Sequence, residues 1–529
     1  MRSHTEQAPT RDGVRLATDV HLPADGPRPE GLTFVLRTPY GRRGGFDAVP
    51  ELAAYLTSLG HVLVSQDVRG KFDSEGQCRP FRQELDDGRD LVEWIAEQPW
   101  STGRLVPTGE SYCGFTALTA AASRHPSIIG VMAGMTTSRV VTDWLYRDRA
   151  FRLQLNAEWI AMSFGQRALP ETLPWAIDDW GRVSDVTDVD TRGADLSALR
   201  ELRSVPIDRD GDTELAGGLT DRCAGVADVP IVLWTGYWDP LARGTIEEFR
   251  SAAASRPGQA HHLELAPTDH LGNPWEAALR RASTQADRAS SLVGCYRRNL
   301  PHLLAAVDGA TGRRGPRVTY QDQRGQAFQS AHWPPVPGDV AVARFDEPVV
   351  VPAPAPLPDL PDSGETFVWG SLAADFPDER ATTERDDVVV VRFDADEVAG
   401  SLELAGEVRW NGAARIVATL AQEQPDGRIL RVAEGVAARP VGHDAGSGGP
   451  EPLLLDLGPA CHRDAGGAGG DRSWVLILAQ EAYPRYLPVA QADAWIAGPA
   501  DRHLPSPAER SDQRIVLTDL TLRTVEGLP

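Results

Sequence analysis

The chain has 529 residues, which is too long for one hydrophobic core and predicts two or three domains. Its composition, 41% hydrophobic and 24% charged, is ordinary for a globular protein in water. With 75 acidic and 53 basic side chains the formal net charge is −22, which argues against binding to nucleic acid or to an anionic membrane, because both need a basic surface.

The sequence shows no signal for targeting or for a metal. The first residues contain no apolar leader and no segment approaches 18 uninterrupted apolar residues, so we expect neither secretion nor a membrane span. No cysteine or histidine spacing resembles a metal site, and we expect no metal or cofactor. The cysteines are scattered and odd in number, which favours reduced thiols in a cytoplasmic protein; they are Cys78, Cys113, Cys223, Cys295 and Cys461.

Strands and helices alternate along the first part of the chain. Short apolar runs predict strands, and Leu91, Trp94 and Ile95 mark one face of a predicted helix. This alternation is typical of a parallel sheet covered by helices on both faces. The predicted strands cover 13–23, 32–36, 61–65, 104–108 and 127–133, and the predicted helices cover 87–97 and 115–124.

A serine lies between small residues where a predicted strand meets a predicted helix. The segment reads Gly109-Glu-Ser-Tyr-Cys-Gly114, and this arrangement is typical of the nucleophile elbow of an α/β-hydrolase. The sharp turn exposes the Ser111 hydroxyl to a base and turns the Tyr112 N–H toward a developing oxyanion. The alternative is a serine that only caps a helix.

The alternation stops after about residue 139. Residues 140–223 are rich in Trp, Arg and Asp and predict helices, in the place where a hydrolase carries its cap. Aromatic residues gather here, and they form either the core of that cap or part of an apolar substrate pocket. They are Trp144, Tyr146, Phe151, Trp159, Phe164, Trp175 and Trp180.

An acid and a base follow two further predicted strands. Asp239 comes after the apolar strand 230–235, and His270 comes after the strand 261–266. The carboxyl ends of parallel strands carry the sites of open α/β sheets, and Ser, then Asp, then His is the hydrolase order along the chain. The alternatives are a turn aspartate before a proline and a solvated loop histidine.

The last part of the chain predicts an all-β sandwich. A Pro-rich stretch through Pro361 predicts a linker or an extended strap. Strands are then predicted at turn-rich spacing, and two Gly-rich runs at 446–449 and 466–470 predict loops. These strands cover 388–393, 400–404, 414–420, 474–478 and 514–517.

Several segments together resemble the cocaine esterase and Xaa-Pro dipeptidyl-peptidase family of serine hydrolases. The similarity covers nearly the whole chain and is strongest from about residue 11 to residue 130. The matching segments are Leu36-Arg-Thr-Pro-Tyr-Gly41, Asp67-Val-Arg-Gly70, Ser74-Glu-Gly76, Asp86 through Trp100, the elbow itself, Gly236 through Thr245, and Ala482-Tyr-Pro-Arg-Tyr486.

The resemblance implies Ser111 as nucleophile, Asp239 as orienting acid and His270 as general base. It also implies an oxyanion hole made by the Tyr40 hydroxyl and the Tyr112 N–H, although Tyr40 alone reads as a packing residue. The implied architecture is an α/β-hydrolase core at 1–139 and 226–315, a helical cap at 140–225, and a C-terminal jelly roll at 336–529.

The chain departs from the family pattern next to two of these residues. Glu110 stands where an uncharged residue usually precedes the nucleophile, and a buried carboxylate must be hydrogen-bonded or protonated. It either stabilises the His270 imidazolium or a cationic substrate group, or serves as a structural carboxylate behind the elbow. Asp269 stands where an aromatic residue often precedes the histidine and is a competing partner for His270. Cys113 is expected to be a small packing residue.

The sequence therefore predicts a serine hydrolase that cleaves an ester or amide of a small molecule. Candidate residues for substrate contact or electrostatics are Glu110, Trp144, Trp159 and Trp238. Acyl transfer to an amine or alcohol would use the same acyl-serine. Aminopeptidase action would need a carboxylate cluster, with candidates Glu110, Asp143, Glu158, Asp178 and Asp179. A more distant alternative is a glycan-binding protein with an inert hydrolase domain, and a homo-oligomer through the β-sandwich is compatible with the sequence.

Overall fold

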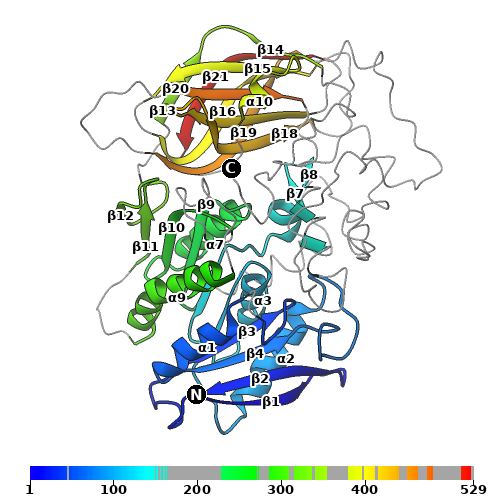
Figure 1. Ribbon diagram of the computed structural model, residues 1–529, viewed down its shortest axis with the longest axis vertical. Coiled ribbons are helices and arrows are strands. Elements are labelled where there is room, and N and C mark those ends of the chain that lie inside the picture. The colour runs from blue at the N-terminus through cyan, green and yellow to red at the C-terminus, as the bar shows by residue number, and fades with distance from the viewer. Residues whose placement is uncertain are drawn as a thin grey trace, which may run out of the picture.

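A computed structural model gives the fold, and it has an α/β part and an all-β part stacked along the long axis of the molecule (Figure 1). The residues that it describes are 1–44, 47–148, 150–152, 155–156, 159–160, 163, 228–270, 272, 285–308, 315–335, 340–353, 379–395, 398–410, 415–439, 449–462, 473–480 and 514–525.

The α/β part is built on a ten-stranded sheet with the order β1-β2-β4-β3-β5-β6-β9-β10-β11-β12. Neighbouring strands from β4 to β11 are parallel, whereas the pairs at the two edges are antiparallel. The strands are β1 (Arg2–Pro9), β2 (Arg15–Leu22), β3 (Thr33–Thr38), β4 (Val62–Asp67), β5 (Leu105–Glu110), β6 (Val131–Gly134), β9 (Ile231–Trp238), β10 (His262–Asp269), β11 (Arg317–Gln321) and β12 (Ala327–Ser330).

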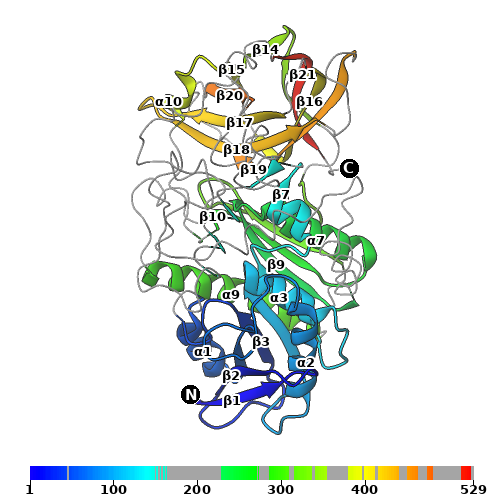
Figure 2. The same ribbon diagram turned by 90° about the vertical axis from the view of Figure 1, so that its right-hand side faces the viewer.

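Helices cover both faces of this sheet, as the continuous apolar strands predict (Figure 2). Helices α1 (Val49–Ser58) and α9 (Gln285–Val307) share one apolar core with the inner strands. Helices α2 (Glu84–Ala96), α3 (Tyr112–Ala121) and α7 (Ala242–Ser255) pack on the opposite face. Burial of the sheet on both faces confirms the predicted α/β class.

The chain directly after β6, at 140–151, differs from the helices predicted there, whereas the described residues 155–156, 159–160 and 163 are helical as predicted. One helical turn of the π type, η1 (Val140–Leu145), is followed by the short antiparallel strands β7 (Tyr146–Arg147) and β8 (Ala150–Phe151). The Tyr146 and Phe151 rings pack edge to face at 5.2 Å, which favours a paired ribbon over a helix. Most of the predicted cap, including Phe164, Trp175 and Trp180, lies outside the described residues.

The all-β part contains two sheets that face each other. One has the order β13-β21-β16-β19 with β14 also paired to β21, and the other has the order β15-β20-β17-β18. Their inward apolar side chains form one shared core, which confirms the predicted all-β class. The strands are β13 (Val340–Phe345), β14 (Val349–Val351), β15 (Val388–Asp394), β16 (Val398–Arg409), β17 (Arg415–Glu423), β18 (Ile429–Ala438), β19 (Glu451–His462), β20 (Ser473–Ala479) and β21 (Ile515–Val525), with the short helix α10 (Arg380–Thr383) before β15.

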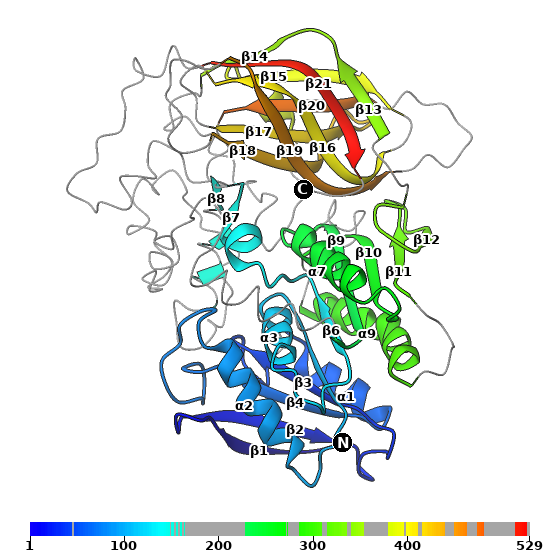
Figure 3. The same cartoon turned by 180° about the vertical axis from the view of Figure 1, so that it is seen from behind.

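The two parts are joined by polar contacts as well as by apolar packing. Strands β7 and β8 lie between α3 and the sandwich (Figure 3), and Ala150 packs against Val417 and Val436. The Arg243 guanidinium is 3.1 Å from the Asp456 carboxylate of β19, and Arg147 donates to the Asp456 carbonyl across 2.9 Å. The sandwich is therefore fixed directly above the edge of the sheet at which β9 ends.

The part of the chain that the structure describes contains neither a membrane-spanning helix nor a metal-binding cluster of side chains. None of its helices is long and apolar enough to cross a membrane. No group of three or more His, Cys, Asp or Glu side chains is arranged to hold a metal ion.

Candidate active site

Ser111 sits at a strained turn between β5 and α3. Its φ of 58° and ψ of −127° fall outside the regions that a serine ordinarily adopts, and such a conformation costs on the order of 1–3 kcal/mol. A Cβ on Gly109 would lie 2.5 Å from the Cys113 Cβ, and one on Gly114 would lie 2.7 Å from Thr136. The glycines therefore let strand, helix and β6 approach closely enough to form the turn. The Thr136 hydroxyl fixes it by donating to the Ser111 carbonyl across 2.8 Å.

The structure brings the three residues predicted from the chain order together. His270 directly follows β10, and its Nε2 is 2.9 Å from Ser111 Oγ. Its Nδ1 is 2.7 Å from Oδ1 of Asp239, the residue after β9. All three side chains are buried. Asp269 is the last residue of β10, and the Nδ1 contact of His270 is made with Asp239, not with this neighbour.

Asp239 is held by groups other than the histidine. The Thr235 hydroxyl donates to Oδ2 across 2.5 Å, and the Leu241 N–H donates to Oδ1 across 2.9 Å. These two hydrogen bonds fix the orientation of the carboxylate. A charged Asp239 favours the tautomer with a proton on His270 Nδ1, which leaves Nε2 as an acceptor for the serine proton.

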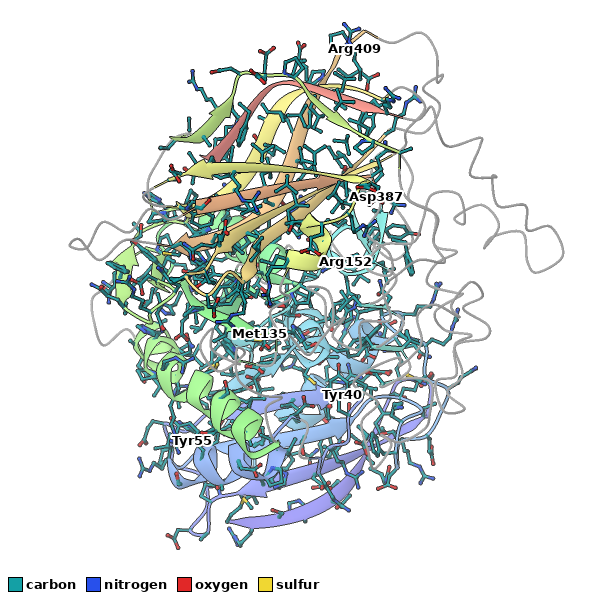
Figure 4. The ribbon with its side chains drawn as sticks, turned by 45° about the horizontal axis from the view of Figure 1, so that its top comes forward. Tyr40, Tyr55, Met135, Arg152, Asp387 and Arg409 are labelled. Carbon is teal, nitrogen blue, oxygen red and sulfur yellow. The ribbon has the colours of Figure 1, made fainter. Side chains whose placement is uncertain are left out.

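Tyr40 lies on the loop after β3, and its phenol is at the elbow. It is 2% exposed, and burial raises the pKa of this phenol well above its usual value, although a hydrogen bond with Ser111 opposes that shift. The neutral phenol is therefore a hydrogen-bond donor at every relevant pH. Figure 4 shows Tyr40 within the α/β part, with Arg152 closer to the sandwich.

The backbone N–H of Tyr112 is the second donor that the resemblance implies. Tyr112 is the first residue of α3, and the N–H groups of a first helical turn point out of the helix toward an anion. Its side chain is anchored on the far side, where the hydroxyl donates to Glu84 Oε1 across 2.8 Å and accepts the Phe81 N–H across 3.0 Å. Arg37 in turn lies 2.8 Å from Glu84 Oε2.

Glu84 is a residue that the sequence analysis missed. Burial raises the pKa of its carboxyl group above the usual value, and the Arg37 charge opposes this. Glu84 is 28 positions from Tyr112, so no local spacing pattern connects the two residues. The only signal was a carboxylate at the start of an amphipathic helix, which is an ordinary helix feature.

Glu110 is buried at the end of β5, next to the nucleophile. Its Oε1 accepts the Trp234 indole N–H across 2.6 Å. The indole reaches it over Gly134 of β6, where an added Cβ would lie 2.2 Å from the Trp234 ring. Two roles were predicted for Glu110, and this contact favours the structural one, because the carboxylate links β5 to β9.

The candidate tryptophans divide into two groups. Trp144 and Trp159 are buried with ring centroids 5.0 Å apart, and both rings contact Phe81 and Tyr112. Trp238 points away, since its Nε1 donates to the Val432 carbonyl of β18 across 3.1 Å and its ring packs against His462. Trp238 thus joins the two parts of the molecule and is removed from the substrate candidates.

The carboxylates expected for an aminopeptidase do not form a cluster among the described residues. Asp143 is 3.3 Å from Arg139 and 3.7 Å from Arg243, whereas Glu110 pairs with Trp234. Glu158, Asp178 and Asp179 lie outside the described residues. Cys113 is buried, and its thiol donates to Asp47 across 3.3 Å, in keeping with a packing role beside the elbow.

Known proteins with related sequences support the predicted resemblance. Residues 12–272 match the profile of the X-Pro dipeptidyl-peptidase (S15) family. Cocaine esterase from Rhodococcus sp. is 37% identical over 158 residues, which are 29% of this chain and 27% of the esterase. A protein of Mycobacterium bovis named as a serine esterase is 25% identical over 396 residues, 61% of this chain and 60% of that protein. The matches thus span less than two thirds of either relative.

Solved structures resemble the fold over almost the full chain. An aminopeptidase from a Thaumarchaeota archaeon has a TM-score of 0.70 at 19% identity and covers 99% of this chain and 96% of its own. An α-amino acid ester hydrolase has a TM-score of 0.70 at 18% identity with the same coverage. At these identities the likeness concerns the fold alone.

Proposed function

We propose that this chain, whose residues 12–272 match the profile of the X-Pro dipeptidyl-peptidase (S15) family, is a serine-type hydrolase that cleaves an ester or amide bond through an acyl-Ser111 intermediate. The observation that supports this proposal most directly is that the His270 imidazole contacts both Ser111 and Asp239. His270 holds Ser111 Oγ at 2.9 Å on one nitrogen and Asp239 Oδ1 at 2.7 Å on the other. This is the arrangement that activates a serine nucleophile.

The proposed reaction has two halves. His270 Nε2 takes the Ser111 proton as Oγ attacks the substrate carbonyl carbon, and the negative oxygen that forms lies between the Tyr40 hydroxyl and the Tyr112 N–H. Collapse of this intermediate breaks the ester or amide bond, and His270 returns the proton to the leaving oxygen or nitrogen. Water then attacks the acyl-serine by the same route and releases the acid.

Burial should strengthen the two proposed oxyanion donors. Tyr40 is 2% exposed and Tyr112 0% exposed, so the charge that develops is stabilised in a site shielded from water. Loss of one such donor costs about 3–4 kcal/mol in acyl transfer. Trp144 and Trp159, beside Tyr112, are proposed as part of the apolar wall that receives the acyl group.

We also propose the finer architecture implied by the resemblance. The core comprises residues 1–139 and 226–315, residues 140–225 form a cap, and residues 336–529 form a jelly roll. The two facing antiparallel sheets with their shared core are compatible with that assignment.

We propose ester or amide hydrolysis in preference to aminopeptidase action. An aminopeptidase must neutralise a free ammonium group, and the described candidates Glu110 and Asp143 are already engaged by Trp234 and by Arg139. Small esters or amides are therefore the proposed substrates. The net charge of −22 supports neither nucleic acid nor an anionic membrane as a partner.

The first test is a time course with p-nitrophenyl acetate and butyrate, with wild type beside Ser111→Ala. We expect steady turnover in wild type and none in the variant. A burst of one equivalent without turnover would instead indicate an acyl-enzyme that waits for an acceptor other than water, and adding an amine or alcohol would then restore turnover. Failure of Ser111 to react with a fluorophosphonate probe would reject the proposal and favour a binding protein.

A further inference from the structure

The phenol oxygen of Tyr40 is the acceptor of a hydrogen bond from the segment that follows β8. Trp159 Nε1 donates to Tyr40 Oη across 3.1 Å, and both side chains are buried. The two residues are 119 positions apart along the chain. The contact therefore ties the segment predicted as the cap to the loop that carries the first oxyanion donor.

This contact limits the directions in which the phenol proton can point. An indole N–H can only donate, whereas a phenol can donate one hydrogen bond and accept others. Tyr40 Oη must consequently be the acceptor toward Trp159, and its own proton must turn elsewhere. Ser111 neighbours the same phenol, so the proton can point toward the nucleophile and the oxyanion while Oη accepts the Trp159 N–H.

The ring of Trp159 also packs against the rings of Tyr112 and Phe81. Its centroid lies 5.5 Å from the Tyr112 ring and 5.1 Å from the Phe81 ring, and Trp159 is 0% exposed. One side chain thus packs on the residue of the second donor while it hydrogen-bonds the first. Packing against these two rings and against the Trp144 ring leaves the indole few rotamers, so the direction of its N–H is well defined.

We propose that Trp159 is a positioning residue that holds the Tyr40 hydroxyl in the orientation that donates to the oxyanion. The inference rests on the proposed function and goes beyond a role for Trp159 in lining the acyl pocket. Preorganised donors accelerate a reaction because no reorientation is needed when charge develops. The acylation rate should therefore depend on the Trp159 N–H, even though this group need not touch the substrate.

The test is a double-mutant cycle between Trp159→Phe and Tyr40→Phe. Phenylalanine at 159 retains a ring in the packed site but removes the N–H. We expect Trp159→Phe alone to lower kcat about 10-fold with KM changed less than about twofold, and Tyr40→Phe alone to lower kcat about 10²–10³-fold. In the double variant Trp159→Phe should add nothing to the loss from Tyr40→Phe, because the hydroxyl that it orients is gone.

Trp144→Phe is the matched comparison. Trp144 belongs to the same aromatic cluster, but its Nε1 has no hydrogen-bond partner among the described residues. Its effect on kcat should multiply with that of Tyr40→Phe. Rates are to be given per active site titrated with a fluorophosphonate, so that loss of folded protein does not enter kcat.

Each remaining outcome has a definite meaning. If Trp159→Phe lowers kcat by the same factor with or without the Tyr40 hydroxyl, or raises KM alone, the positioning role is rejected and Trp159 is a pocket wall. If Tyr40→Phe leaves kcat unchanged, the oxyanion assignment fails and takes the positioning role with it. If Ser111→Ala is as active as wild type, the proposed function itself fails.

Discussion

The Thr235 hydroxyl donates to Asp239 Oδ2 across 2.5 Å, so the acid of the site is anchored by the strand that carries it. Oδ1 is left to face His270 Nδ1 at 2.7 Å and also accepts the Leu241 N–H. The carboxylate is thereby fixed in rotation, and one of its oxygens is aimed at the imidazole. The orientation of His270 thus depends on Thr235, a residue buried within β9.

Replacement of Asp239 by asparagine should lower kcat about 10⁴-fold, because an amide at this position stabilises the wrong imidazole tautomer. Thr235→Val should cost much less, about 10-fold or under, since it removes one of the supporting hydrogen bonds but leaves the charge. Turnover of p-nitrophenyl butyrate per titrated site measures both effects. Equal losses in the two variants would contradict a direct contact of Asp239 with His270 in catalysis.

The elbow should not tolerate a methyl group at Gly109. Its φ of +151° and the 2.5 Å approach to Cys113 together predict a loss of about 3 kcal/mol or more in the free energy of unfolding for Gly109→Ala. Gly103→Ala is the matched control, because Gly103 also has a positive φ, +70°, but no atom lies within 4 Å of the added Cβ. Denaturant titration of both variants measures the difference, and similar losses would show that crowding at the elbow is unimportant.

Much of the α/β part could be predicted because each strand is a short, fully buried apolar run. The run 230–235 predicted β9, and the run 261–266 predicted β10, so the positions of Asp239 and His270 followed directly. Strand β1 was missed, since it is mostly exposed and carries no apolar alternation. Strand β19 was missed because its apolar run at 453–455 is short and lies between two Gly-rich runs.

The parts of the site that could not be predicted depend on contacts between distant residues. Trp238 stands in a segment that resembles the family, yet its Nε1 donates to the carbonyl of Val432, 194 positions away. Trp159 meets Tyr40 only through the tertiary fold. Sequence periodicity reports which face of an element is buried, but it does not report which buried side chains share a hydrogen bond.

Glu110→Gln should leave the pH dependence of kcat/KM unchanged. Glutamine keeps an oxygen that can accept the Trp234 N–H, so the expected change is a loss of about 1 kcal/mol in stability as a charged acceptor becomes neutral. Trp234→Phe should cost more, because it leaves the carboxylate buried without that donor. A shift of the acidic limb of the pH profile in Glu110→Gln would instead show that Glu110 stabilises the His270 imidazolium.

The stability of the protein should fall as the pH drops from about 6.5 toward 4, partly because of two histidines at the starts of core strands. His61 Nδ1 accepts the Leu32 N–H across 3.1 Å, and His261 Nδ1 accepts the Ile231 N–H across 3.3 Å. Burial lowers the pKa of each to about 4. A protonated Nδ1 cannot accept these bonds.

The sign of this effect follows from the protons bound by each state. Between pH 6.5 and about 4 the unfolded chain binds protons at His61 and His261 that the folded protein does not. The contribution of these two histidines to the free energy of unfolding is therefore fully present above pH 6.5 and declines as the pH falls through this window. His261→Asn offers an oxygen as acceptor but does not titrate, and it should reduce the slope of unfolding free energy against pH. An unchanged slope in His261→Asn would mean that this histidine is not the group that takes up the proton on unfolding.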